Sequence, residues 1–281
     1  MSMQLRIVHT TGFEYDGHAV ASYNQARLTP LTTTEQIVVH SRLEVTPKPW
    51  TYEYRDYFGT AVTAFEVLDP HEAMTVTATC TVQTNRPPTP KPSISWEGLT
   101  GPEVSDRWTE YLTLPETVAP PADLAERVDA IRAASELPGL AARRLCALVN
   151  DEVEYIPGAT DVHTRAAEAW EQRAGVCQDM VHLVIGGLRQ MRIPARYVSG
   201  YFHPHPQPTI GETVHGESHA WVEWWDNGWH PFDPTNDHEP CDRYVVLATG
   251  RDYQDVKPLS GIYSGSSTST MSVEVEVTRL G

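Results

Sequence analysis

The chain has 281 residues, enough for one large domain or two ordinary ones, and its 40% hydrophobic and 21% charged residues are typical of a folded globular protein. Its 21 basic and 37 acidic residues give a net charge of −16, which repels phosphate backbones and anionic lipid headgroups. We therefore expect neither nucleic acid nor a membrane among its partners.

The first residues and the cysteines indicate a cytoplasmic protein. Residues 1–9 hold a single Arg and no apolar run of signal-peptide length, and no later stretch approaches the length of a membrane span. The cysteines lie far apart without a C-x-x-C pair, which argues against a zinc knuckle or a disulfide framework. They are Cys80, Cys146, Cys177 and Cys241.

The N-terminal third predicts an antiparallel β domain, which we expect to be sandwich-like. Short runs of alternating apolar and polar residues are separated by Pro and Gly, the pattern of strands joined by turns. These runs are 5–8, 36–39, 43–45, 62–68 and 74–82. Four prolines in residues 86–92 then favour an extended linker. We place a boundary there, between one domain over 1–88 and a second over 89–281.

The second part begins with helical patterns and ends with strands, an α+β layout in which helices pack on an antiparallel sheet. Apolar spacing predicts helices over 122–134, 139–150 and 164–173, and a fourth that begins at Cys177 and ends before Pro194. Gly175 is expected to end the third helix or to form a tight turn. Strands are expected over 195–202, 219–225, 229–232 and 272–278.

Cys177 is the strongest candidate for a nucleophile. At the first turn of a helix its sulfur lies near the positive end of the helix dipole and near unpaired backbone N–H groups, which favours thiolate over thiol. The same N–H groups could face a developing oxyanion, and Gly175 permits close approach of the backbone. The alternative is a buried cysteine that only packs, which is the commoner fate of an isolated Cys.

His219 and Asp233 can meet across a hairpin. The residues Asp226-Asn227-Gly228 suit a three-residue loop, a type I turn followed by Gly in the left-handed conformation. That loop pairs Trp225 with Trp229 and places Asp233 opposite Trp221, diagonal to His219 on the same face. A two-residue Asn227-Gly228 turn would instead put Asp233 on the other face. A His oriented by a carboxylate can hold one tautomer and act as a base toward a thiol.

Four linked segments resemble the core of the transglutaminase-like superfamily. They are 173–179 (RAGVCQD), 192–201 (RIPARYVSGY), 217–223 (ESHAWVE) and 232–235 (FDPT). The segments 57–60 (YFGT) and 69–71 (DPH) resemble the β domain that precedes this core in bacterial members. There Thr60 stands where that domain is expected to have Asn. The resemblance covers nearly the whole chain.

The resemblance implies a papain-like arrangement without a cofactor. Cys177 would attack a carboxamide carbon of a protein or peptide, His219 would shuttle the proton, Asp233 would orient His219, and a thioester would form. Water would then give hydrolysis and an amine would give transamidation. Tyr155 is the candidate oxyanion partner, with a core role as its alternative. Two further residues, Trp221 and Gln178, are the candidates for lining the substrate groove, and cross-strand packing is the alternative for Trp221.

Other functions remain open at this point. The same fold could be a catalytically silent module that binds a protein partner. Cys177 and His219 could also hold zinc, because thiolate and imidazole are good zinc ligands. His203, His205 and His215 fit no tetrahedral ligand spacing, so we assign no metal to them. Cys80, Cys146 and Cys241 are interpreted as structural.

Overall fold

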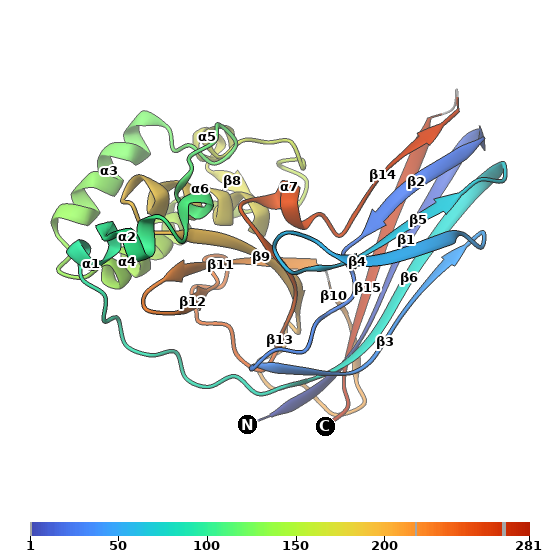
Figure 1. The fold of residues 1–281 in the computed structure, drawn as a ribbon, viewed down its shortest axis with the longest axis horizontal. Helices are drawn as coiled ribbons and strands as arrows, with labels where there is room; N and C mark the ends of the chain where they lie inside the picture. Colours follow the sequence, from blue (N-terminus) through green and yellow to red (C-terminus); the bar gives the residue numbers. More distant parts are fainter. Residues whose placement is uncertain (1, 217, 266–267) are drawn as a thin grey trace.

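The structure is a computed structural model that describes residues 2–216, 218–265 and 268–281. Long strands form one side of the molecule, and helices packed with shorter strands form the other (Figure 1). Antiparallel sheets precede the helical core, so the expected α+β class is confirmed. Among the described residues, no helix is long and apolar enough to span a bilayer.

Two antiparallel sheets form the strand-rich side. Their strands are β1 (Met3–Ala19), β2 (Ala21–Ala26), β3 (Gln36–Thr46), β4 (Trp50–Arg55), β5 (Ala61–Val67), β6 (His71–Thr84), β10 (Thr213–Gly216), β14 (Leu259–Ser264) and β15 (Ser269–Arg279). One sheet has the order β10-β15-β1-β6-β3, and the other has the order β14-β2-β5-β4. Every second residue of β6 from Met74 to Val82 is buried, which is the period of a strand with one covered face.

The expected N-terminal strands lie within this pair of sheets, with two differences. The expected runs 36–39 and 43–45 are one strand, β3, which carries a register shift between Val38 and His40. Strands β2 and β4 were not predicted. All but one residue of β4 is exposed, so neither of its faces is covered. Its sequence therefore lacks the alternation of apolar and polar residues that marks a half-buried strand.

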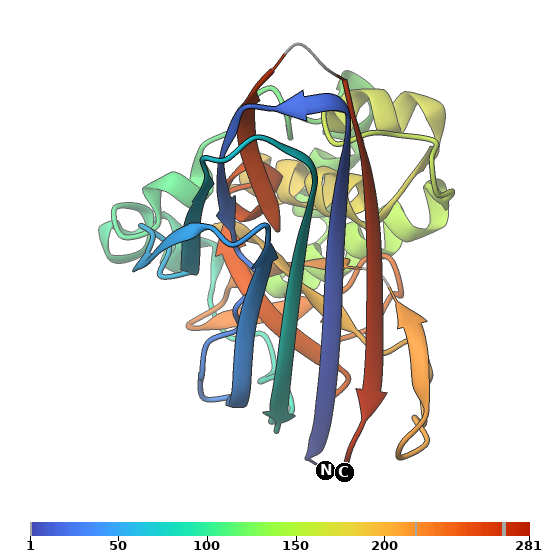
Figure 2. The ribbon, with the colours of Figure 1, turned by 90° about the vertical axis from the view of Figure 1, so that its right-hand side faces the viewer.

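The C-terminal strands pair with the N-terminal ones. The segment 272–278 was expected to close the second half of the chain, but β15 pairs with β1 from Leu5 opposite Arg279 to Tyr15 opposite Ser269. Strand β14 likewise pairs with β2. Figure 2 shows β15 beside β1 and the two ends of the chain close together. The division at residue 88 stays a prediction, but the hydrogen-bonded sheets do not follow it.

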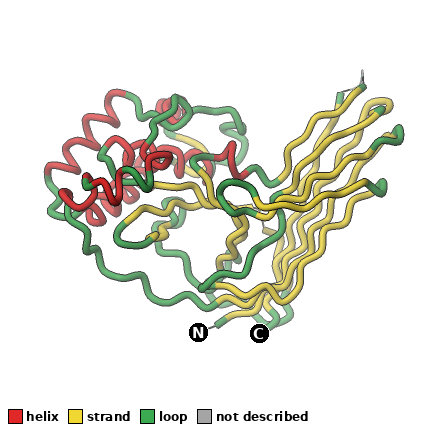
Figure 3. Tube along the Cα trace, in the orientation of Figure 1, coloured by secondary structure: helices red, strands yellow, loops and turns green. Residues whose placement is uncertain are grey.

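The connection after β6 is extended, as the prolines predict, and forms neither helix nor strand over residues 85–95 (Figure 3). It is nevertheless held in place. The buried carboxylate of Asp226 accepts hydrogen bonds from the backbone N–H groups of Ser93 and Ile94, at 2.9 and 2.7 Å. The chain therefore reaches the helices along a fixed path.

The helices surround a buried central one. They are α1 (Trp96–Thr100), α2 (Pro102–Ser105), the 3-10 turn η1 (Thr109–Leu112), α3 (Ala122–Ala133), α4 (Pro138–Glu152), α5 (Ala166–Gln172), α6 (Cys177–Gln190) and α7 (Tyr253–Val256). Helices α3, α4, α5 and α6 confirm the expected ones. The side chains that predicted α6, namely Val181, Val184, Ile185 and Leu188, are all fully buried.

A second four-stranded sheet lies against α6. It has the order β12-β11-β9-β13, formed by β9 (Ala195–Phe202), β11 (Ser218–Trp225), β12 (Trp229–Phe232) and β13 (Tyr244–Gly250). A short parallel pair joins β7 (Glu154–Tyr155) to β8 (Ala174–Gly175) just before α6. The buried face of α6 thus fixes its first residue at the end of this sheet.

Gly175 does not end the preceding helix as expected. The left-handed residue after α5 is Arg173, with φ 53°, and Gly175 lies in the extended strand β8. A Cβ atom at Gly175 would lie 2.8 Å from the Cβ and Oδ2 atoms of Asp179. The glycine is therefore required by a close approach to the first turn of α6, not by a positive φ.

Candidate active site

Cys177 is the first residue of α6, as the sequence predicts. The helix start is held by Asp179, whose Oδ2 accepts hydrogen bonds from the Val176 N–H at 2.8 Å and from the Thr160 hydroxyl at 2.6 Å. Asp179 is 1% exposed, and burial raises the pKa of its carboxyl. The turn that carries the Cys177 sulfur is thus tied to the loop that follows β7.

His219 and Asp233 form a direct hydrogen bond, 2.7 Å from Nε2 to Oδ2. His219 and Cys177 line the same cavity, and Cys177 is among the groups that raise the pKa of His219. Because Nε2 is engaged by Asp233, Nδ1 is the nitrogen left for the sulfur. The structure therefore brings the three residues together, with His219 between the cavity that holds Cys177 and the carboxylate of Asp233.

Asp233 is fully buried and accepts from five donors. Besides His219, its Oδ2 accepts from the Tyr244 hydroxyl at 2.6 Å and the Asn236 amide at 2.7 Å. Its Oδ1 accepts from the backbone N–H groups of Thr235 and Asn236, at 2.9 and 3.2 Å. Such a cage stabilises an ionised carboxylate and fixes its direction.

These contacts set the charges of the pair. Burial alone would lower the pKa of His219, but the hydrogen bonds to Asp233 and Cys177 and the negative charges of both raise it well above its ordinary value. Burial likewise would raise the pKa of Asp233, but the hydrogen bond and charge of His219 outweigh it and lower the pKa below its ordinary value. At neutral pH the geometry therefore favours an imidazolium at His219 beside the ionised carboxylate of Asp233.

The hairpin has the expected register and a different turn. Trp225 pairs with Trp229, so the three-residue loop is confirmed. The left-handed residue is Asn227, with φ 57°, and not Gly228 as expected. Strand β12 ends at Phe232, and Asp233 bridges His238 and has no pairing with Trp221. The carboxylate thus reaches His219 from the turn at the end of the strand.

An open groove runs past His219. A cavity of about 360 Å³ holds Cys177, and its walls include Gln178, Tyr197 and Tyr253. A second cavity of about 530 Å³ continues beyond His219. Both cavities share Tyr155, Gly216, Ser218 and His219. A substrate chain lying across His219 could therefore occupy both.

The other expected site residues divide into two groups. Tyr155 is 41% exposed on β7 and lines the groove, and Gln178 lines it beside Cys177. Trp221 does not, which corrects its assignment to the groove. Its side chain is fully buried and packs with Val198 on the neighbouring strand β9 and with Tyr244 on β13, the edge strand of the same sheet. Glu217, the first residue of the ESHAWVE segment, lies outside the described residues.

Sequence reasoning missed Tyr244 and Asn236, which hold Asp233. Tyr244 lies on β13, a strand that was not predicted, and Asn236 lies in the turn after Asp233. Only the Pro-Thr-Asn run that follows Asp233 in the sequence signals a turn there. Nothing local in the sequence points from Tyr244 to Asp233.

The remaining cysteines differ in exposure. Cys80 and Cys146 are buried, and burial raises the pKa of Cys80 to about 12 and that of Cys146 still further. Cys241 is exposed. Within the described residues, the cluster of three metal-ligating side chains within 4.8 Å of one another is His215, Glu274 and Glu276, which includes neither Cys177 nor His219.

Two family models match separate regions of the chain. Residues 5–83 match the bacterial transglutaminase-like N-terminal region, and residues 124–234 match the transglutaminase-like superfamily. An uncharacterized protein of Mycobacterium leprae (strain TN) is 43% identical over 277 residues, which cover 99% of both chains. An uncharacterized protein of Mycobacterium tuberculosis (strain ATCC 25618 / H37Rv) is 33% identical over 97% of this chain and 91% of its own.

A solved structure shares the fold. The crystal structure of a candidate cysteine protease from Cytophaga hutchinsonii has a TM-score of 0.78 and 24% identity, and covers 100% of this chain and 92% of that one. The relatives and the matched regions together identify the family. The chain belongs to the transglutaminase-like superfamily and carries the N-terminal region of its bacterial members.

Proposed function

We propose that the protein is a cysteine-dependent acyltransferase or amidase that acts on glutamine or peptide amides through a thioester. One observation carries this proposal: Cys177 and His219 line one groove, and Asp233 holds His219 there by a hydrogen bond. A thiolate, an imidazolium and an orienting carboxylate in this order are the parts that acyl transfer requires. A protein or peptide is the proposed substrate, because the two joined cavities suit an extended chain.

The first half of the reaction forms the thioester. The Cys177 thiolate attacks the carboxamide carbon, and the carbonyl oxygen becomes an oxyanion. The Cys177 backbone N–H and the Tyr155 hydroxyl are the proposed donors to that oxygen. His219 then gives its proton to the departing nitrogen, so that ammonia or an amine leaves as the carbon–nitrogen bond breaks.

The second half releases the acyl group. Neutral His219 takes a proton from water or from an incoming amine, which attacks the thioester carbon and expels the Cys177 thiolate. Water gives hydrolysis, and an amine gives transamidation. Asp233 stays ionised throughout and holds His219 in the orientation that presents Nδ1 to the sulfur. The cytoplasm is the proposed location.

Mass spectrometry of a glutamine-containing peptide tests the proposal. The peptide is incubated with the protein, with and without a primary amine, and Cys177→Ala serves as the control. We expect deamidation or cleavage without the amine, or amine incorporation with it, and none of these with Cys177→Ala. A peptide left unchanged by the wild-type protein, but retained by it in a pull-down, would favour the catalytically silent binding module.

A further inference from the structure

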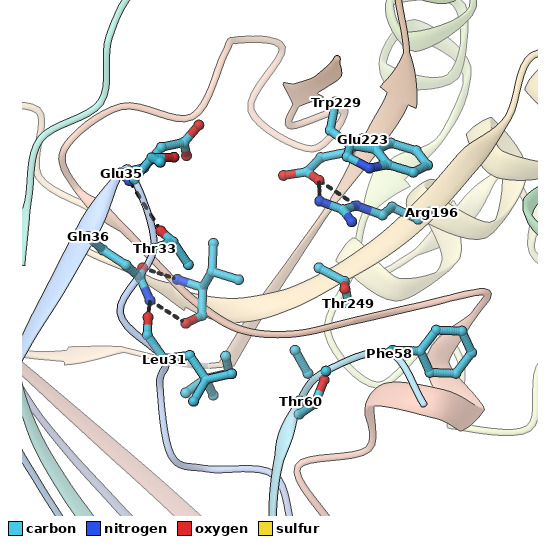
Figure 4. Close-up of a pocket in the computed structure, with 15 residues that line it drawn as sticks. Leu31, Thr33, Glu35, Gln36, Phe58, Thr60, Arg196, Glu223, Trp229 and Thr249 are labelled. Atoms are coloured by element: carbon cyan, nitrogen blue, oxygen red, sulfur yellow. Dashed lines mark hydrogen bonds and ion pairs between the residues drawn. The ribbon is translucent and has the colours of Figure 1, made fainter. Parts of the chain in front are cut away.

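A second cavity, of about 430 Å³, lies where the N-terminal strands meet the sheet of the core. It shares no lining residue with the groove at Cys177. Figure 4 shows Arg196, Glu223 and Thr249 on one side, and Gln36 and Thr33 on the other. The volume is that of a small-molecule site, and junctions between domains are common places for one.

An ion pair between the buried Glu223 and the partly buried Arg196 faces this cavity, with one hydrogen-bonding atom free on each side. Nε and Nη2 of Arg196 both bond Oε2 of Glu223, at 2.6 and 2.5 Å. Glu223 is 7% exposed. Among the described residues, Oε1 of Glu223 and Nη1 of Arg196 have no protein partner, and neither atom is sealed from solvent. The cavity therefore presents an acidic acceptor beside a basic donor.

The rest of the wall holds the pair in place and adds hydroxyl groups. The Arg196 guanidinium carbon lies 4.2 Å from the ring centroid of Trp229, a cation–π contact that fixes its plane. Thr60 is 3% exposed and lines the cavity, and its hydroxyl is not among the sealed polar atoms of the described residues. The Thr60 hydroxyl is therefore open to the cavity and available to hydrogen-bond a polar ligand.

Three of the segments that carry the family resemblance meet at this cavity without touching Cys177. Arg196 comes from 192–201, Glu223 ends 217–223, and Thr60 ends the YFGT segment. The proposed catalytic role uses none of these three residues. Their convergence from distant parts of the chain is therefore unexplained by the groove.

We propose that this cavity binds a small zwitterion, an α-amino acid, whose carboxylate accepts from Nη1 of Arg196 and whose ammonium donates to Oε1 of Glu223. A purely anionic ligand would face the carboxylates of Glu223 and Glu35, and a purely cationic one would face Arg196. A zwitterion offers each charge its opposite, and its carboxylate can also accept from the Thr60 hydroxyl. The site is independent of the proposed acyl transfer.

Isothermal titration calorimetry of the full chain tests the proposal. The probes are the proteinogenic L-amino acids, with ethylamine, propionate and propionamide as analogues that keep one charge or none. The variants are Glu223→Gln and Thr60→Val, which keep the shape of the wall. Glu171→Gln is the matched control, because Glu171 is exposed on α5 and far from the lining residues.

At least one amino acid is expected to bind, and the single-charge and neutral analogues are not. Glu223→Gln should weaken binding by about tenfold or more, and Thr60→Val by less, because a hydrogen bond to a charged group contributes more than one to a neutral group. Glu171→Gln should bind as wild type does. No heat with any amino acid would overturn the proposal. Propionamide binding as tightly as the amino acids would also overturn it. A third contrary result would be wild-type affinity in both Glu223→Gln and Thr60→Val, provided that their circular dichroism spectra match that of the wild type.

Discussion

The thiol at Cys177 differs from the other three in what surrounds it. It is half-buried at a helix start and shares a cavity with His219, whose raised pKa favours the imidazolium, whereas Cys80 and Cys146 are buried in the core. Iodoacetamide at neutral pH should therefore label Cys177 first. Peptide mapping by mass spectrometry measures this.

Cys241 is the informative competitor in that labelling, because it is exposed but has no histidine of the triad beside it. A Cys241→Ser variant should leave the fast phase of labelling unchanged, and Cys177→Ser should remove it. If Cys241 reacted as fast as Cys177, exposure alone would explain the reactivity, and the helix start and His219 would have no part in it.

Asp233→Asn tests the orienting carboxylate. We expect activity to fall by about 10²- to 10⁴-fold, because the loss of a negative charge lowers the pKa of His219 and weakens its orientation. The free energy of unfolding should also fall moderately, by about 1–3 kcal/mol. The Asp233 carboxylate accepts hydrogen bonds from five donors, and the NH₂ group of an Asn side chain would face some of these donors without being able to accept from them.

The pH profile of Cys177 alkylation separates orientation from misfolding in that variant. An imidazolium stabilises the thiolate, so a His219 with a lower pKa loses its charge earlier as pH rises, and the thiolate then forms only at higher pH. Both Asp233→Asn and His219→Ala should move the profile to higher pH. If Asp233→Asn matched wild type while His219→Ala moved the profile, Asp233 would not be the orienting group.

At the scale of elements, the hairpin shows what loop chemistry can predict. The three-residue loop after Trp225 gave the correct register, and that register carries His219 and Asp233 to the same end of the sheet. The positive φ fell on Asn227 and not on Gly228, because Asn also tolerates the left-handed region. Strand alternation could not show that Trp221 packs with Val198 and Tyr244, because the pattern of one strand does not identify the strands beside it.

Deleting Asn227 should abolish activity through register. Asp226 is held in position by its hydrogen bonds to the backbone of Ser93 and Ile94. With Asp226 fixed, a loop shorter by one residue shifts every residue of β12 by one position. Asp233 would then point to the other face, away from His219. Replacing Asn227 with Gly keeps the loop length and accepts the positive φ, so it should retain most of the activity. If the deletion were as active as Asn227→Gly, the hairpin would not position the carboxylate.

At the scale of the whole molecule, the sequence predicted elements well and long-range pairing poorly. Helices α3 and α6 follow from apolar spacing within one segment. The pairing of β15 with β1 joins residues more than 250 positions apart, and an alternating pattern does not identify its partner. The two ends are also joined by hydrogen bonds from Gln4 N–H to the Gly281 carbonyl at 2.9 Å and from Leu280 N–H to the Gln4 carbonyl at 2.7 Å.

That pairing predicts opposite fates for two rearranged chains. A chain ending at residue 258 lacks β14 and β15, so β1 and β2 lose a neighbour and the buried Val275 and Val277 no longer cover the sheet. It should be less stable by several kcal/mol, because two buried Val side chains contribute about 1.5–3 kcal/mol each. Urea unfolding, followed by tryptophan fluorescence, measures the difference.

The second chain is a circular permutant that begins at Pro88, ends at Pro87 and joins residues 281 and 1 through a short Gly-Ser linker. Both new ends are exposed, and the linker spans termini that already lie side by side. Since β1 and β15 then become neighbours in sequence, the permutant should fold with near wild-type stability and label at Cys177 at the wild-type rate. If instead the chain ending at residue 258 matched wild type in both measurements, β14 and β15 would be dispensable, and the strand-rich half would be complete at residue 88.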